Sequence, residues 1–126
     1  VIDDGSHVNS HQIETFRILW PFVSDSGTYI IEDVQTSYWP AFGGGHVESR
    51  EYANSCMGHF KKMVDSVNLP EFLAPAGAEL PLDPAIGRIA FYHNLIVVTK
   101  DTSARRSNVR LDDERVRRML MSRRDP

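Results

Sequence analysis

The chain has 126 residues, of which 41% are hydrophobic and 25% are charged, and its formal net charge is −3. This composition is ordinary for a globular protein, and the absence of a long apolar run argues against a membrane-spanning class. A single cysteine, Cys56, rules out an internal disulfide and predicts a reducing, cytoplasmic compartment. Val1 already lies in a strand pattern, so we expect residues upstream of it.

Charge is unevenly distributed along the chain. Residues 101–126 contain eight arginines and five acidic residues, whereas residues 1–100 contain six basic and twelve acidic residues. The acidic part suits cation binding, and the basic tail is typical of a solvated or partner-facing helix. We therefore expect neither a nucleic-acid nor a membrane partner. The first strand would leave an open sheet edge, and we expect the chain to self-associate through it as a homo-oligomer.

A short β-branched run that ends in carboxylates opens the chain, and it predicts a buried strand from Val1 to Asp4. Asn9 followed by Gln12 resembles a capping pair and predicts a helix with Asn9 as its N-cap. Pro21 ends or kinks this helix. Its apolar positions recur at helical spacing and are Ile13, Phe16, Trp20 and Val23.

Thr28 to Asp33 form a second run of the same kind, again apolar up to its acids. A strand–helix–strand unit of this length predicts parallel strands with a right-handed crossover. Parallel neighbours place their C-terminal ends at the same sheet edge, so Asp4, Glu32 and Asp33 should converge.

The next segments alternate between loop and helix. Residues 34–46 predict an aromatic and glycine-rich loop over the acidic edge, and a helix is expected from Glu48 to Val67. Four prolines argue against regular structure in most of residues 68–84. The apolar stripe expected for the helix is Tyr52, Cys56, Phe60, Val64 and Val67.

Two strand-like runs follow, from Ile86 to Tyr92 and from Leu95 to Lys100. His93 and Asn94 between them predict a tight hairpin turn, so the sheet should end in an antiparallel pair. A short amphipathic helix is expected after Asp112, with acids first and bases last as the helix dipole prefers.

The carboxylates at the two strand ends, Asp4, Glu32 and Asp33, are candidate metal ligands. Three hard oxygen ligands without a Cys/His ligand spacing favour Mg²⁺, Ca²⁺ or Mn²⁺ over zinc. Acids at such positions can equally cap helices or be solvated. Asp3 should point to the opposite face from Asp4, because side chains alternate along a strand.

His7 lies in the turn beside these acids and is a candidate general base, since imidazole is suited to accept a proton near neutral pH. A capping or hydrogen-bonding histidine is the alternative.

The aromatic side chains of Tyr38, Trp39 and Phe42 lie in the predicted loop at the site edge. They can stack on an organic ligand or pack onto the sheet edge. The three glycines from Gly43 to Gly45 do not fit a dinucleotide fingerprint and predict a flexible loop over the crevice. Cys56 falls in a helical stripe and is expected in the core.

The first 45 residues resemble the metal-dependent sugar O-methyltransferases of macrolide biosynthesis, the mycinamicin type, which are class I S-adenosylmethionine enzymes. The same signature is similar to that of the cephalosporin hydroxylase group. The resemblance is looser from residue 46 to residue 100 and does not cover the tail. It rests on Ile2–His7 (IDDGSH), Phe16, Pro21, Gly27–Asp33 (GTYIIED), Thr36–Trp39 (TSYW) and Gly43–Gly44.

The resemblance implies Mg²⁺ and S-adenosylmethionine as cofactors, Asp4, Glu32 and Asp33 as metal ligands, and His7 as general base. It also implies an α/β fold, the C-terminal half of a Rossmann-like methyltransferase sheet whose last strand is antiparallel. Residues 1–100 would form this half of the catalytic domain, and residues 101–126 a polar basic tail with a short helix.

The glycine-rich loop and the acid with which this family binds S-adenosylmethionine have no match in the chain. We therefore expect a fragment that carries the metal, the base and part of the acceptor site, inactive alone, from an enzyme that methylates a sugar or another polyhydroxylated natural product. Two alternatives stay open. One is a non-catalytic interaction module docked by the basic tail, and the other is an oxygenase, although a 2-His-1-carboxylate triad is not evident.

Overall fold

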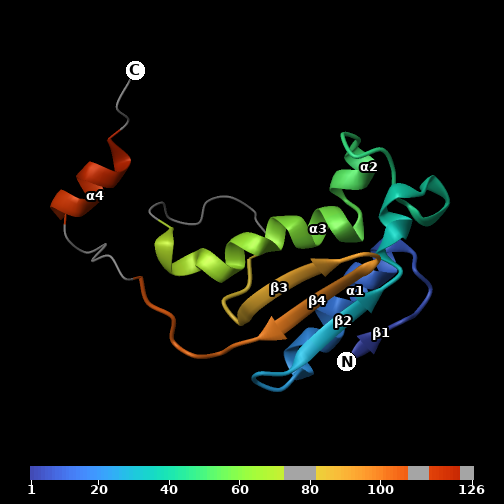
Figure 1. Cartoon of the computed structure of the whole chain (residues 1–126), viewed down its shortest axis with the longest axis horizontal. Coiled ribbons are helices and arrows are strands. Elements are labelled where there is room, and N and C mark those ends of the chain that lie inside the picture. Colours follow the sequence, from blue (N-terminus) through green and yellow to red (C-terminus); the bar gives the residue numbers. More distant parts are fainter. Residues whose placement is uncertain (73–81, 108–113, 123–126) are drawn as a thin grey trace.

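The computed structural model describes residues 1–72, 82–107 and 114–122. The strands are β1 (Ile2–Asp3), β2 (Thr28–Glu32), β3 (Ile86–Tyr92) and β4 (Leu95–Lys100). The helices are α1 (Asn9–Leu19), α2 (Arg50–Ala53), α3 (Cys56–Met63) and α4 (Glu114–Met121) (Figure 1). Shorter 3₁₀ segments are Trp20–Phe22, Val34–Tyr38, Pro40–Phe42 and Val64–Glu71. Among these described helices, none has the length and apolar character needed to cross a membrane.

The four strands form one sheet in the order β1-β2-β4-β3. β1 and β2 are parallel, and β4 runs antiparallel to both β2 and β3. The predicted parallel pair and the predicted hairpin are both confirmed, the hairpin with the expected strand bounds. Asn94 in its turn has φ 57°, a left-handed conformation that asparagine tolerates better than most residues.

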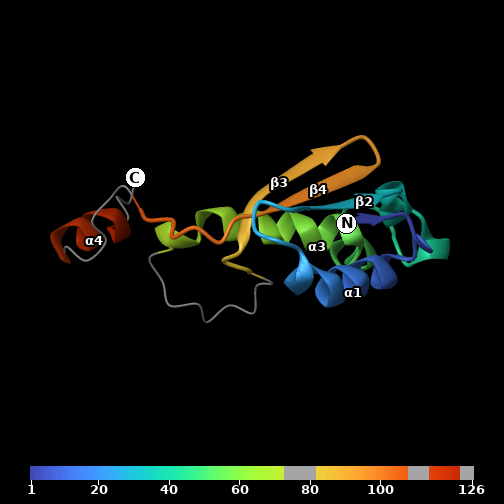
Figure 2. The same cartoon turned by 90° about the horizontal axis from the view of Figure 1, so that it is seen from below.

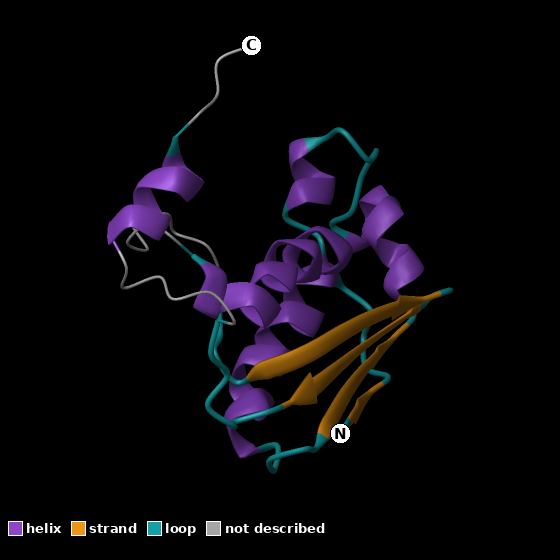
Figure 3. Cartoon of the chain, turned by 60° about the vertical axis from the view of Figure 1, so that its left-hand side comes forward, coloured by secondary structure: helices purple, strands orange, loops and turns teal. Residues whose placement is uncertain are grey.

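Helices α1 and α3 lie on the same face of the sheet (Figures 2 and 3). The side chains that point to this face are buried because strand residues alternate between faces. Phe16 of α1 lies at the centre of the core, with its ring 4.8–5.2 Å from three other aromatic rings. The strand residues of this core are Tyr29, Ile31, Ile86, Ile96 and Val98, and the rings around Phe16 are Trp20, Tyr29 and Phe60.

Cys56 is fully buried in this core, as its helical position predicts. Burial raises the pKa of its thiol to about 12, so the group stays protonated and unreactive near neutral pH.

The prediction of Asn9 as an N-cap is wrong. Val8 occupies the cap position with extended backbone angles, and Asn9 is the first residue inside α1. Its side chain is 2% exposed and bonds to distant segments instead of to the helix end. Tertiary partners have therefore overridden a local capping preference.

The single helix predicted from residue 48 to residue 67 is also wrong, because the chain breaks after Ala53. Ser55 starts a new helix by accepting a hydrogen bond from the backbone N–H of Gly58, which is a standard N-cap arrangement. Beyond Met63 the helix tightens into a 3₁₀ segment that extends to Glu71, past the expected end. Within the predicted stripe, Tyr52, Cys56 and Phe60 are buried, whereas Val64 is 38% exposed.

β1 is one of the two edge strands of this sheet, and the side chain of Ile2 is exposed. Self-association through this edge stays a prediction, which light scattering would test. Much of the proline-rich segment, residues 73–81, and parts of the tail, residues 108–113 and 123–126, lie outside the described residues.

Candidate active site

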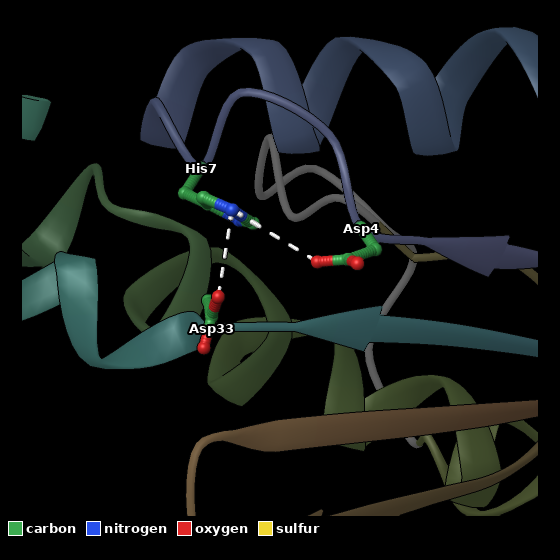
Figure 4. A group of neighbouring side chains, drawn as sticks. All are labelled: Asp4, His7 and Asp33. Atoms are coloured by element: carbon green, nitrogen blue, oxygen red, sulfur yellow. Dashed lines mark ion pairs between the residues drawn. The ribbon is translucent and has the colours of Figure 1, made fainter.

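Two strand ends and the turn after β1 bring three polar side chains together (Figure 4). Asp4 follows β1 and Asp33 follows β2, and the parallel pairing places both at one edge of the sheet. The Nε2 atom of His7 lies 3.4 Å from Oδ2 of Asp33 and 3.9 Å from Oδ1 of Asp4. One ligand atom from each of the three residues lies within 4.8 Å of the others.

Two of these residues have a left-handed backbone conformation, which directs their side chains toward each other. His7 has φ 57° and Asp33 has φ 53°. Aspartate and histidine adopt this region more readily than most other residues, whereas β-branched residues avoid it. The chain can therefore turn sharply at the end of β2 while it keeps the carboxylate of Asp33 directed toward the imidazole of His7.

Asp33 is held in place by the segment that follows it. The side-chain amide of Gln35 donates to Oδ1 of Asp33 at 2.9 Å, while Oδ2 faces His7. The backbone N–H and the hydroxyl of Thr36 both donate to the backbone carbonyl of Asp33. Sequence reasoning missed Gln35. Its position two residues after an acid at a strand end is the only signal that could have singled it out.

The carboxylates at this edge are largely exposed, and His7 is the base that lies against them. The exposed fraction is 63% for the Asp4 side chain and 46% for Asp33. Among the described residues, neither aspartate forms an ion pair with a lysine or an arginine. Two adjacent carboxylates repel each other, so an arrangement of this kind suits a bound cation.

Buried polar atoms without a hydrogen-bond partner also gather near this edge. Within the described part of the chain they are Nδ1 of His7, Oε1 of Gln12 and Oε1 of Gln35. Such atoms are costly unless they serve a function or meet a ligand. Oxygen donors beside an imidazole fit a hard divalent cation, with Mg²⁺ preferring the oxygens.

Glu32, predicted as a ligand, is not part of the group of three. It is half-buried at the end of β2, and its backbone carbonyl accepts a hydrogen bond from Gln12 at 2.9 Å. Asp3 points the other way, into the core, where the hydroxyl of Tyr29 donates to it at 3.0 Å. The side chains of Asp3 and Asp4 therefore lie in different surroundings, as the strand alternation predicts.

Two of the three predicted aromatic residues are well exposed. The side chain of Tyr38 is 42% exposed and that of Trp39 is 49% exposed. The ring of Tyr38 stacks on Tyr52, and the ring of Trp39 lies 6.0 Å from that of Phe42. Partial burial and the neighbouring Tyr52 raise the pKa of Tyr38 above its ordinary value. The exposed ring area is available to an organic ligand.

The glycine run does not form the flexible loop that the sequence predicts. Gly43 adopts the left-handed region at φ 78°, and Gly44 is packed so closely that a Cβ atom would come within 2.4 Å of the Ser37 backbone. The N–H groups of Gly44 and Gly45 donate to the carbonyls of Trp39 and Ser37. Close packing therefore requires glycine at position 44, and the left-handed backbone favours it at position 43.

The parallel β1–β2 pair and the antiparallel end of the sheet define the C-terminal part of a class I methyltransferase fold. No family model matches the chain. It is 39% identical over 101 residues to the 8-demethyl-8-alpha-L-rhamnosyl tetracenomycin-C 2'-O-methyltransferase of Streptomyces olivaceus, covering 79% of this chain and 26% of that relative. It is 38% identical to the mycinamicin VI 2''-O-methyltransferase of Micromonospora griseorubida, covering 79% of this chain and 25% of that relative.

The structural comparison agrees with the sequence comparison. The MycE methyltransferase of the mycinamycin biosynthetic pathway, solved in complex with Mg and SAH, superposes with a TM-score of 0.71 at 36% identity, covering 80% of this chain and 26% of that one. The chain spans about a quarter of the length of the curated relatives it matches. It is thus homologous to one part of the sugar O-methyltransferases of macrolide and polyketide pathways, and the resemblance stated from residues 1–45 is confirmed.

Proposed function

We propose that this chain supplies the metal-binding and proton-abstracting residues of a Mg²⁺- and S-adenosylmethionine-dependent O-methyltransferase. The acceptor is a sugar or another polyhydroxylated natural product. The observation that carries the proposal is the convergence of Asp4, His7 and Asp33 at the end of a parallel strand pair. The relatives are named O-methyltransferases, and the MycE methyltransferase was solved with Mg and SAH.

The chemistry of the donor atoms divides the roles within the group. Mg²⁺ prefers oxygen ligands, so the carboxylates of Asp4 and Asp33 are assigned to the metal. The imidazole of His7 is then the general base. One histidine with two carboxylates favours this reading over a non-haem iron oxygenase, which uses two histidines and one carboxylate.

Glu32 remains the proposed third ligand, although its carboxylate lies outside the group of three. It is adjacent to Asp33, at the end of the same strand. A Glu32→Gln variant is therefore the sharpest test of the ligand set.

The residues of this chain would act on the acceptor in a defined order. The exposed rings of Tyr38 and Trp39, with the half-buried Phe42, provide apolar surface for the acceptor beside the acidic edge. A bound magnesium ion supplies Lewis acidity that lowers the pKa of an acceptor hydroxyl group. The Nε2 atom of His7 would accept the hydroxyl proton. S-adenosylmethionine, when bound, would supply the methyl group to the acceptor oxygen and leave as S-adenosylhomocysteine. Gln35 keeps Asp33 oriented throughout.

Metal binding by the 126-residue chain tests the proposal most directly. Mg²⁺ affinity is measured by calorimetry, with Mn²⁺ as a spectroscopic substitute. We expect Asp4→Asn and Asp33→Asn each to weaken binding by more than about tenfold, which corresponds to about 1.4 kcal/mol. The control is Asp25→Asn, because Asp25 is an exposed aspartate at the other end of the sheet that bonds to Thr102. Unchanged affinity in both site variants would rule out the metal assignment.

Methyl transfer can be tested with a chimera in which this chain replaces the matching quarter of the MycE methyltransferase. We expect the chimera to bind Mg²⁺ and S-adenosylhomocysteine and to methylate mycinamicin VI. A chimera that binds both but transfers no methyl group would argue against the assignment of the base and the acceptor surface.

A further inference from the structure

The side chain of Asn9 uses its full hydrogen-bonding capacity inside the protein. Its amide nitrogen donates to the backbone carbonyls of Thr36 at 3.0 Å and of Phe42 at 2.9 Å. Its amide oxygen accepts from the hydroxyl of Ser37 at 3.0 Å and from the backbone N–H of Cys56 at 2.8 Å. A primary amide has two donors and about two acceptor positions, and all four are satisfied here in a buried site.

These four bonds join segments that carry the candidate active site. Thr36 and Ser37 lie in the short 3₁₀ segment that begins directly after Asp33. Phe42 belongs to the aromatic loop, which we define as residues 38–45. Asn9 itself lies two residues after His7. One amide therefore links three segments. They are the end of β2, which carries the candidate metal ligand, the aromatic loop, which carries the candidate acceptor surface, and helix α1, which follows the candidate base.

The aromatic loop is also closed at its base by contacts of its own. The N–H groups of Phe42 and Gly44 both donate to the carbonyl of Trp39, and the N–H of Gly45 donates to the carbonyl of Ser37. The ends of the loop are thus held together, and Asn9 fixes the closed loop to the segment after Asp33. Without Asn9, the carbonyls of Thr36 and Phe42 would both lose this donor, and the Thr36 carbonyl would keep the N–H of Trp39.

We propose that Asn9 is a positioning residue that locks the aromatic loop to the strand end of Asp33, so that the acceptor surface and the metal site form one pre-organised unit. The roles given to the loop and to Asp33 rest on the proposed function. The hydrogen bonds by which Asn9 joins the two segments do not depend on it. In this arrangement the loop keeps one position beside the site. Metal binding at Asp33 further restricts the motion of the loop, and Asn9 is the residue that couples the two.

The substitution Asn9→Asp changes the two bonds that the amide donates and leaves the two bonds that it accepts. The carboxylate keeps an oxygen for Ser37 and Cys56 but places a second oxygen, in place of the donor, against the carbonyls of Thr36 and Phe42. The variant therefore weakens the attachment of the loop, since even a protonated carboxyl group can donate to only one of the two carbonyls, while it retains the bond to helix α3.

Amide hydrogen exchange of the 126-residue chain without metal tests the lock. In Asn9→Asp we expect the amides of Phe42, Gly43 and Gly44 to exchange about tenfold faster than in the wild type, while the β3–β4 hairpin changes by less than about threefold. Equal acceleration in loop and hairpin would show that Asn9 only stabilises the fold. Unchanged loop exchange would equally overturn the proposal.

Ser55→Ala is the matched control, because it removes a fully buried hydroxyl whose bonds stay within residues 52–58. We expect its loop exchange to match its hairpin exchange. If Asn9→Asp does not fold, Asn9→Ser replaces it, because a single hydroxyl can donate to at most one of the Thr36 and Phe42 carbonyls that the amide holds together. About threefold faster exchange confined to the loop would then support the lock, and equal acceleration in the hairpin would overturn it.

The same measurement with saturating Mg²⁺ tests the transmission, which a purely structural asparagine would not affect. We expect Mg²⁺ to slow loop exchange in the wild type and to have no effect on the loop in Asn9→Asp, although the variant keeps Asp4, His7 and Asp33. Mg²⁺ binding that leaves the wild-type loop unprotected, or protects both proteins equally, would overturn the transmission. If Mg²⁺ does not bind the wild type, the proposed metal site fails, and the metal-free comparison still decides the lock.

Discussion

The two ends of the sheet are built from the same strands but differ in how their polar groups are used. At the site end, where β1 and β2 terminate, Asp4 and Asp33 face His7 and have no lysine or arginine partner among the described residues. At the opposite end, where β4 terminates, Lys100 donates to two backbone carbonyls and lies over the Trp20 ring. The opposite end is therefore arranged for stability, and the site end retains unsatisfied groups that a ligand can use.

Backbone conformation follows the same division. Four described residues other than glycine have positive φ, and three of them lie at the site end, as part of the turns after β1 and β2 and the β3–β4 hairpin. Strained conformations of this kind concentrate at functional sites, where the surrounding fold holds them. The three residues are His7, Asp33 and Asn94, and the fourth, Ser26, lies at the opposite end.

The largest expected effect is on turnover, when the base at the site end is removed. In the chimera, His7→Gln should lower kcat by about 10²–10⁴-fold, the usual contribution of general base catalysis. Mg²⁺ affinity should change by less than about threefold, since the carboxylates remain. Rapid-quench kinetics and calorimetry check the two quantities. A parallel loss of Mg²⁺ affinity would make His7 a metal ligand instead of the base.

The matching experiment at the opposite end should affect stability alone. Trp20→Ala removes a buried ring that stacks on Phe16 and donates to Asp83, and we expect a loss of about 3–5 kcal/mol in unfolding free energy. Mg²⁺ affinity of the folded protein should not change. Urea unfolding followed by circular dichroism gives the first quantity and calorimetry the second. A weakened metal site in this variant would mean that the two ends are not independent.

A smaller effect is expected from Gln35, which orients Asp33. Gln35→Ala should weaken Mg²⁺ binding by about tenfold, at the low end of the range for residues that orient metal ligands. Thr102→Val is the control, because it also removes a hydrogen-bond donor from an aspartate, Asp25, at the opposite end. Equal Mg²⁺ affinities in the two variants would remove the role assigned to Gln35.

The smallest effect concerns pH and Asp25. Hydrogen bonds from the backbone and hydroxyl of Thr102 hold the pKa of Asp25 below its ordinary value of 3.8. Its contribution to stability is thus present above that value and is lost as the pH falls through the lower folded-state pKa. The stability difference between the wild type and Asp25→Asn should be small at pH 7 and should shrink further toward pH 3. Urea titrations at both pH values measure it, and a difference that grows in acid would contradict this assignment.

The strands and the site end could be predicted because their signals are local in sequence. Apolar runs that end in acids mark β1 and β2, and the crossover length fixes their parallel pairing. Parallel pairing then places Asp4 and Asp33 at one edge, so geometry follows from topology without a detailed structure. Glu32 shows the limit of that inference. Strand ends converge as a group, whereas individual side chains depend on the face to which each points.

The contacts that hold the site could not be predicted, because they join residues far apart in the chain. Asn9 resembles a helix cap locally, and its partners lie 27 to 47 residues away. The break before Cys56 follows from Ser55 taking a capping role that a continuous apolar stripe conceals. Gly44 looks like a flexible residue until the backbone of Ser37 is placed against it.

The hydrogen bond from Tyr29 to Asp3 has a consequence for the alignment of β1. Asp3 and Asp4 are chemically identical neighbours, and a slip of one residue would exchange the core carboxylate with the site carboxylate. β1 has only two residues paired with β2, so the backbone ladder alone is a weak constraint on alignment. Tyr29 is fully buried, and its hydroxyl donates to Asp3 at 3.0 Å. This bond stabilises the alignment in which Asp3 points into the core. A tyrosine in the core thereby selects which of two equivalent aspartates reaches the acidic edge.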